Sequence, residues 1–250
     1  QLQSSAASDV YKRQVLLTQR RILQANLIAH GVLPGLAIAI ALQLDPAIGG
    51  WISGLAAALL AERLMRNHQQ QQEAVQNTVL AGALATGVLL MALLQQRVEL
   101  EALLFGDLLI AGGRDLFQTL LAAAAAIALI GSQYQRLVFS GVDPDGAEAA
   151  GVPIQRLRIL LAVVTTLVIV SAISAVGIIL VIALLCAPAV LGLQQASSLS
   201  GAMTRAAVIG SSCSLGGFGM ALLLDLPPGP VIGLLCLLLL WLPKSDHSKN

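Results

Sequence analysis

Eight apolar stretches, each long enough or nearly long enough to cross a lipid bilayer, limit the folds that this chain can adopt. A helix that spans the hydrocarbon core needs about 20 mostly apolar residues, or somewhat fewer when it packs inside a bundle. The sequence therefore predicts an all-α, polytopic transmembrane helical bundle with about eight membrane segments. These lie at residues 22–42, 47–64, 74–94, 116–131, 159–174, 176–193, 206–224 and 231–242.

The small number of charged residues excludes a water-soluble fold. Only 11% of the residues are charged and 57% are hydrophobic, whereas about 25% are charged in soluble globular proteins. So few charges would not cover the surface of a soluble protein, so lipid is expected to surround most of the exterior. We expect a multi-pass protein of the cell (inner) membrane with membrane lipid as a partner. With few aromatic residues and no basic cluster, nucleic acid is not an expected partner.

The basic residues predict which side of the membrane each connection occupies, because Lys and Arg collect on the cytoplasmic side. If the chain before the first span is inside, strict alternation places only Arg97 and Arg114 outside. The remaining basic residues considered then lie inside, namely Arg20, Arg21, Arg63, Arg66, Arg136, Arg156, Arg158, Arg205, Lys244 and Lys249. Residues 133–158 and the tail at 244–250 are therefore predicted to be cytoplasmic.

The remaining segments complete the predicted domain organisation. Residues 100–111 are apolar but too short to span, which predicts a short interfacial or re-entrant helix. Residues 1–14 are polar and lack the hydrophobic region of a signal peptide. They are similar to the adaptor read-through found at the start of reading frames from bulk sequencing, and we expect a non-native leader. A single transmembrane domain is predicted over residues 15–243.

The longest polar connection, residues 133–158, contains the signature of a short helix. In DPDG, Asp143 can cap a helix whose first position is taken by Pro144. A helix over residues 147–150 is predicted to follow, and Gly151 with Pro153 would end it. Such a helix across the end of a bundle offers a contact for another protein. An ordinary ordered loop is the alternative.

Five motifs, in order, resemble the permease subunits of ATP-binding-cassette importers for manganese, zinc and iron. They are RRILQANLIAHGVLPGLAIA, LLFGDLL, DPDGAEAAGVPIQRLR, AVGIILVIALLCAPAV and DLPPGP, and the resemblance covers about residues 20–242. It implies a transporter subunit that is not itself an enzyme and carries no cofactor, with ATP bound by a partner. It also implies three partners: an ATP-binding subunit, an extracytoplasmic metal-binding protein and a second permease copy, identical or different.

The resemblance also implies a role for the short cytoplasmic coupling helix, which docks into a cleft of the ATPase subunit. The corresponding residues here are Asp143, Pro144, Ala147, Glu148, Ala150 and Gly151. Ala147, Glu148, Ala150 and Gly151 are the expected contact surface, because small side chains let a helix seat closely. Family members usually have a further spanning helix before the Arg20-Arg21 pair, so the chain is interpreted as lacking the family's first helix.

Asn26 and His30 form the candidate metal-binding pair of the translocation pathway. Four residues apart, they share one face of a helix. An ionisable residue inside a span indicates a functional site, and neutral imidazole is a good ligand for zinc, manganese or iron. The family carries Asp at the position of Asn26, and Asn supplies a carbonyl oxygen without negative charge. Polar bonding between helices is the alternative role for the pair.

Pro34 and Gly35 are predicted to break the first span beside the pathway, because proline removes a backbone donor. A kink that serves packing alone is the alternative.

Two other classes of protein would leave different signs in the sequence. A secondary transporter driven by ion gradients would need paired ionisable residues at mid-membrane, and apart from His30 the spans contain almost none. An intramembrane zinc protease would need a motif such as His-Glu-x-x-His, which the sequence lacks. The importer permease is therefore the predicted function, and the secondary transporter is its alternative.

Overall fold

The computed structural model describes residues 23–67, 71–94, 112–194 and 198–241, and within these ranges every regular element is a helix. Contacts divide the chain into two compact units, Gln1–Ile178 and Ile179–Asn250. The predicted leader, the interfacial helix at 100–111 and the tail lie outside the described residues. The prediction of a single transmembrane domain over residues 15–243 stays a prediction.

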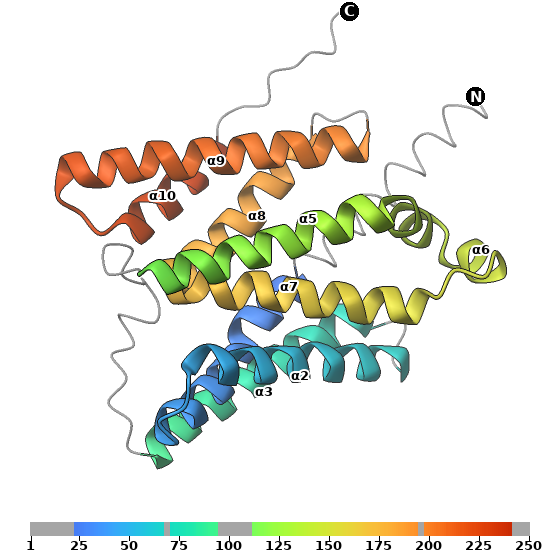
Figure 1. The fold of residues 1–250 in the computed structure, drawn as a ribbon, viewed down its shortest axis with the longest axis horizontal. Coiled ribbons are helices and arrows are strands. Elements are labelled where there is room, and N and C mark those ends of the chain that lie inside the picture. The colour runs from blue at the N-terminus through green and yellow to red at the C-terminus, as the bar shows by residue number, and fades with distance from the viewer. Residues whose placement is uncertain (1–22, 68–70, 95–111, 195–197, 242–250) are drawn as a thin grey trace, which may run out of the picture. The chain divides into compact units, whose positions relative to one another are not determined.

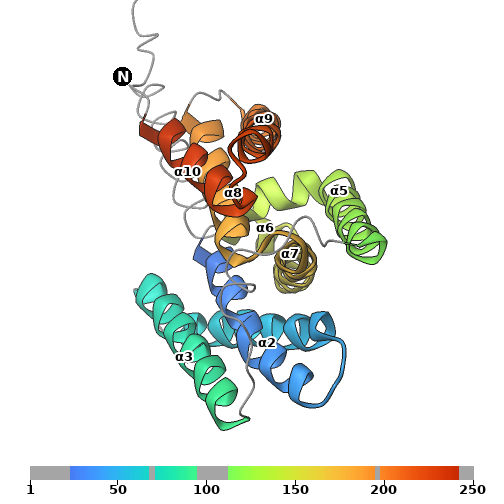
Figure 2. The same cartoon turned by 90° about the vertical axis from the view of Figure 1, so that its left-hand side faces the viewer.

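In the first unit, α7 lies between α5 on one side and α2 on the other (Figures 1 and 2). Helix α3 packs on α2, and the short α6 contacts the ends of both α5 and α7. The bounds of these elements, in chain order, are Leu23–Ala41 (here the first span), α2 Pro46–Asn67, α3 Gln72–Leu93, α5 Gly113–Val142, α6 Pro144–Ala149 and α7 Ile154–Val176.

The second unit consists of α8 (Ile178–Gln194), α9 (Leu199–Leu224) and α10 (Pro228–Trp241). Asp225 adopts a left-handed backbone conformation, with φ of 54°, at the turn between α9 and α10. The two helices then approach closely, since a Cβ added at Gly217 would lie 2.6 Å from the Ile232 side chain. Cys213 of α9 and Cys236 of α10 are buried.

The helices confirm an all-α, multi-pass architecture. Among the described residues, six helices are long and apolar enough to cross a membrane, namely the first span, α2, α3, α5, α7 and α9, and α8 and α10 are shorter apolar helices. These eight helices match the eight apolar stretches of the sequence. Large apolar side chains face outward on several of them, as in α5, where Phe117 is 67% and Ile127 is 71% exposed. Such a surface suits lipid rather than water.

Helix α5 is longer than the sequence pattern predicted. The predicted span ended at residue 131 and a polar connection followed, but the helix continues to Val142. The polar composition of residues 133–142 did not indicate that the helix extends past the apolar span. Gln and Arg are good helix formers, and neither Gly nor Pro interrupts residues 133–140. The helix ends at Val142, because the next residue, Asp143, precedes proline and has φ of −139° and ψ of 85°.

The first span is the most buried of the six membrane-spanning helices. It crosses α2 at glycines: a Cβ added at Gly35 would lie 2.0 Å from the Gly49 carbonyl oxygen, and one at Gly31 would lie 2.7 Å from the Ala57 Cβ. Ser53 of α2 donates a hydrogen bond to the Val32 carbonyl at 3.0 Å across this crossing. Without a hydrophobic driving force between helices in lipid, such close backbone approach is what holds helices together.

Candidate functional site

The candidate metal-binding residues lie on the least buried face of the first span. Leu27, Ile28 and Ala29 are fully buried, whereas Asn26 and His30 are half-buried. Pro34 and Ile38 continue the same face at intervals of four residues, and Ile38 is 43% exposed. The structure therefore places Asn26 and His30 on one face of the helix, as the sequence spacing predicted, and Pro34 continues this stripe.

The imidazole of His30 is held by its own helix. Its Nδ1 lies 3.0 Å from the backbone carbonyl oxygen of Asn26. Because a carbonyl only accepts, Nδ1 carries the proton and donates it in this bond. In the neutral ring, Nε2 is then the unprotonated nitrogen, which is the form that binds metals. A hydrogen bond from the second ring nitrogen to a carbonyl is also what usually orients histidine ligands.

The described residues near His30 do not by themselves complete a metal site. In the described ranges, no three His, Cys, Asp or Glu side chains are grouped closely enough to hold a metal ion. Asn26 adds at most one neutral oxygen. Further ligands would have to come from outside these ranges or from another chain. The role of both residues as metal ligands stays a prediction.

The first span continues through the predicted helix break. It is helical from Leu23 to Ala41, with Pro34 and Gly35 in its interior. Proline removes only one backbone donor, so the helix loses one hydrogen bond without ending. Both residues serve close packing: Gly35 meets Gly49 of α2, and a Cβ added at Gly87 of α3 would lie 3.2 Å from the Pro34 nitrogen. Their predicted position beside a pathway stays a prediction.

The predicted short helix is present as α6, and its start is capped as the sequence indicated. The Asp143 Oδ1 accepts a hydrogen bond from the Gly146 N–H at 3.0 Å, and Pro144 occupies the first turn. Sequence analysis did not single out Gly146. A Cβ there would lie 2.2 Å from the Asp143 Oδ2, so the glycine is what lets the carboxylate close over the helix end. Its place three residues after the cap could have indicated this role.

The end of α6 has the geometry of a Schellman motif. Gly151 has φ of 79°, and its N–H donates to the Glu148 carbonyl at 2.9 Å. The Val152 N–H donates to the Ala147 carbonyl, also at 2.9 Å. A side chain at Gly151 would be strained in this left-handed conformation. Both ends of α6 are therefore fixed by local hydrogen bonds.

The exposed face of α6 differs in one residue from the predicted contact surface. Glu148, Ala150 and Gly151 are exposed, but Ala147 is fully buried. Ala147 packs inward, where a methyl group lets the six-residue helix sit close to α5 and α7. Ala147 therefore packs α6 against the rest of the chain and is not accessible to a partner. The predicted contact surface for the ATPase subunit is thereby reduced to Glu148, Ala150 and Gly151, and it stays a prediction.

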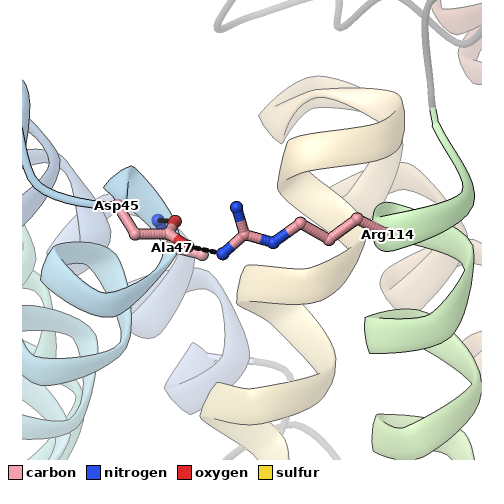
Figure 3. Close-up of polar contacts among 3 residues, drawn as sticks. All are labelled: Asp45, Ala47 and Arg114. Atoms are coloured by element: carbon pink, nitrogen blue, oxygen red, sulfur yellow. Dashed lines mark hydrogen bonds and ion pairs between the residues drawn. The ribbon is translucent and has the colours of Figure 1, made fainter.

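Two ion pairs fix α2 at opposite ends. At its start, one Asp45 oxygen accepts from the Ala47 N–H at 3.0 Å and the other pairs with Arg114 of α5 (Figure 3). Near its end, Glu62 pairs with Arg158 of α7 at 2.8 Å. Arg114 was predicted to lie on the outer side of the membrane and Arg158 on the cytoplasmic side. Exposed ion pairs contribute about 1 kcal/mol or less to the free energy of unfolding. These two pairs therefore matter more for how α2 is positioned against α5 and α7 than for stability.

These features define the class of the protein: a multi-pass membrane protein with a buried span that carries a polar stripe and a rigid, exposed helix between two spans. The chain belongs to the ABC 3 transport family, whose sequence pattern matches residues 10–244. Membership in this family sets aside the alternative of a secondary transporter.

Individual relatives agree with this assignment. An uncharacterised membrane protein of Cyanophora paradoxa is 31% identical over 94% of this chain and 81% of its own length. The manganese transport system membrane protein MntC of Listeria monocytogenes is 29% identical over 88% of this chain and 79% of its own. The solved structure of PsaBC from Streptococcus pneumoniae in complex with Fab matches with a TM-score of 0.79 and 28% identity, over 96% of this chain and 87% of that one.

Proposed function

We propose that this protein is the permease subunit of an ATP-driven importer that moves a divalent metal ion into the cytoplasm. The observation that carries the proposal is α6, a helix capped at both ends, which exposes Glu148 and is followed by the exposed Ala150 and Gly151. It lies between two spans and contacts both, so a force applied to it would reach α5 and α7 directly. A separate ATP-binding subunit would supply that force, and this chain would bind no ATP.

The metal would pass along the stripe of Asn26 and His30. Manganese is the first candidate, because relatives such as MntC are named for manganese transport. Iron is the second, since the chelated iron transport system membrane protein YfeD of Yersinia pestis is 29% identical over 84% of this chain. An unprotonated Nε2 and a carboxamide oxygen suit both ions. An extracytoplasmic binding protein would deliver the metal, and a second permease copy would complete the pore.

A chain of packed helices would couple the ATP-binding subunit to the residues Asn26 and His30. Helix α6 contacts α7, α7 contacts α2, and α2 crosses the first span at Gly35 and Gly49. Movement of α6 would therefore be transmitted through packed helices to the helix that carries His30. Such rigid elements between two discrete arrangements are the usual means of alternating access.

Uptake by reconstituted vesicles tests the function. The chain is reconstituted with an ATP-binding subunit and an extracytoplasmic binding protein, and uptake of Mn²⁺, Fe²⁺ and Zn²⁺ is measured separately. We expect Mn²⁺ uptake that requires ATP hydrolysis, stops with vanadate and is unchanged by a protonophore. Uptake that continued without ATP and collapsed with the protonophore would contradict the proposal.

A further inference from the structure

A shallow hollow of about 150 Å³ lies where the end of α5 meets the start of α7. Its lining combines two arginines and one glutamine with apolar side chains. The residues are Gln133, Arg136, Val152, Pro153, Arg156, Leu157 and Leu160. Of the lining leucines, Leu157 is buried, whereas Leu160 is 43% exposed. The lining of the hollow is therefore both cationic and apolar.

The two arginines carry positive charge that no carboxylate neutralises within the described part of the chain. Arg136 donates to the Gln133 Oε1 at 3.1 Å, a neutral acceptor on the same helix. Arg156 forms neither of the two ion pairs found among the described residues. Arg158, two positions further, differs because it pairs with Glu62. Both lining guanidinium groups are exposed and have donors available for an anion.

The length of α5 indicates where the hollow would lie relative to the bilayer. Arg136 follows Arg114 by 22 residues along the continuous helix α5, which corresponds to about 33 Å at the rise of an α-helix. This distance is close to the roughly 30 Å thickness of the hydrocarbon core. If Arg114 lies at one surface, Arg136 lies at the other. Leu160 follows Arg156 by one helical turn, toward the apolar part of α7.

We propose that this hollow binds the headgroup of an anionic phospholipid. Arg136 and Arg156 would donate hydrogen bonds to the phosphate oxygens, and Leu157 and Leu160 would contact the first carbons of the acyl chains. Basic pockets between spans on the cytoplasmic side are suited to such lipids. A protein carboxylate would satisfy the arginines but would leave Leu160 exposed, so the combination of basic and apolar side chains in the lining favours a lipid. The site is independent of which ion the protein transports.

Native mass spectrometry of the full chain in a detergent with an uncharged headgroup tests this site. The probes are dioleoylphosphatidylglycerol, which is anionic, and dioleoylphosphatidylcholine, which is zwitterionic. We expect tighter binding of phosphatidylglycerol, and a loss of about fivefold in its affinity for Arg136→Gln or Arg156→Gln alone. The double variant should lose about 25-fold. Binding of phosphatidylcholine should not change.

The matched control is Arg63→Gln. Arg63 is exposed on α2 next to Glu62, which pairs with Arg158, so it lies at the same end of the first unit but outside the hollow. This variant removes the same charge and should leave the affinity for phosphatidylglycerol unchanged. Equal losses for Arg63→Gln and Arg156→Gln would show a general charge effect and overturn the site.

Two further outcomes would overturn the proposal. Displacement of phosphatidylglycerol by an excess of inorganic phosphate would show a free-anion site rather than a lipid site. Loss of an ATP-binding subunit from the double variant, with unchanged phosphatidylglycerol affinity, would show that the arginines contact a protein.

Discussion

Replacing Gly35 with alanine is expected to destabilise the protein by about 3 kcal/mol or more, near the upper end for overpacked sites. The added Cβ would lie 2.0 Å from the Gly49 carbonyl oxygen and 2.4 Å from the Ser53 Oγ. The main obstacle is backbone, so no side-chain rotation relieves the clash. The first span and α2 would have to separate, with loss of the hydrogen bond from Ser53 to Val32.

Thermal unfolding in detergent measures this effect, and Gly82→Ala is its matched control. Gly82 also lies inside a spanning helix, but a Cβ there meets nothing within 4 Å. Alanine at Gly82 should leave stability unchanged or raise it by up to about 1 kcal/mol, because alanine is the better helix former. Equal effects of the two substitutions would contradict the account of the crossing, whereas a selective loss for Gly35→Ala supports it.

Replacing His30 with leucine is expected to reduce Mn²⁺ uptake about 100-fold, the upper range for losing an element of a metal site. Leucine removes the Nε2 that the proposal assigns to the metal but keeps a half-buried side chain of similar bulk. The Nδ1 bond to the Asn26 carbonyl is also lost, so thermal stability is measured in parallel. Unchanged uptake by a stable His30→Leu protein would exclude His30 from the pathway.

The opposite effect is expected for Asn26→Asp, which introduces the acid that the resemblance implies at this position. A carboxylate adds negative charge beside the metal, so half-maximal uptake should need about tenfold less Mn²⁺, in line with one charged ligand. Asn77→Asp is the matched control, because it makes the same change on the exposed surface of α3. If both variants shifted the Mn²⁺ dependence equally, the effect would be one of net charge.

Much of the architecture was predictable because the bilayer imposes it. The apolar stretches predicted the helices, since a span must be long, apolar and internally hydrogen-bonded. The ends of α6 were predictable for a different reason. The Asp143 cap and the Gly151 stop depend on hydrogen bonds within a few residues, so local sequence determines them. The end of α5 was missed because polar residues with high helix propensity occur in loops and in helices alike.

Tertiary contacts were less predictable, because they depend on neighbours distant in sequence. Gly35 was interpreted as part of a helix break, but its partner is the backbone of Gly49. Ala147 was assigned to an outer surface, but α5 and α7 leave it fully buried. The pairing of Glu62 with Arg158 joins residues 96 positions apart. Helical spacing placed Asn26 and His30 on one face, but it did not show that Nδ1 is bound to a backbone carbonyl.

Contact between α6 and an ATP-hydrolysing subunit is the central claim, and photo-crosslinking tests it most directly. In one variant, a photoreactive amino acid replaces Glu148 on the exposed face of α6. In the control variant it replaces Gln135, which is exposed on α5. We expect Glu148 to cross-link to the ATP-binding subunit with a yield that changes when ATP is added, and Gln135 to give little product. An ATP-binding subunit that supports uptake but never cross-links to position 148 would contradict the account.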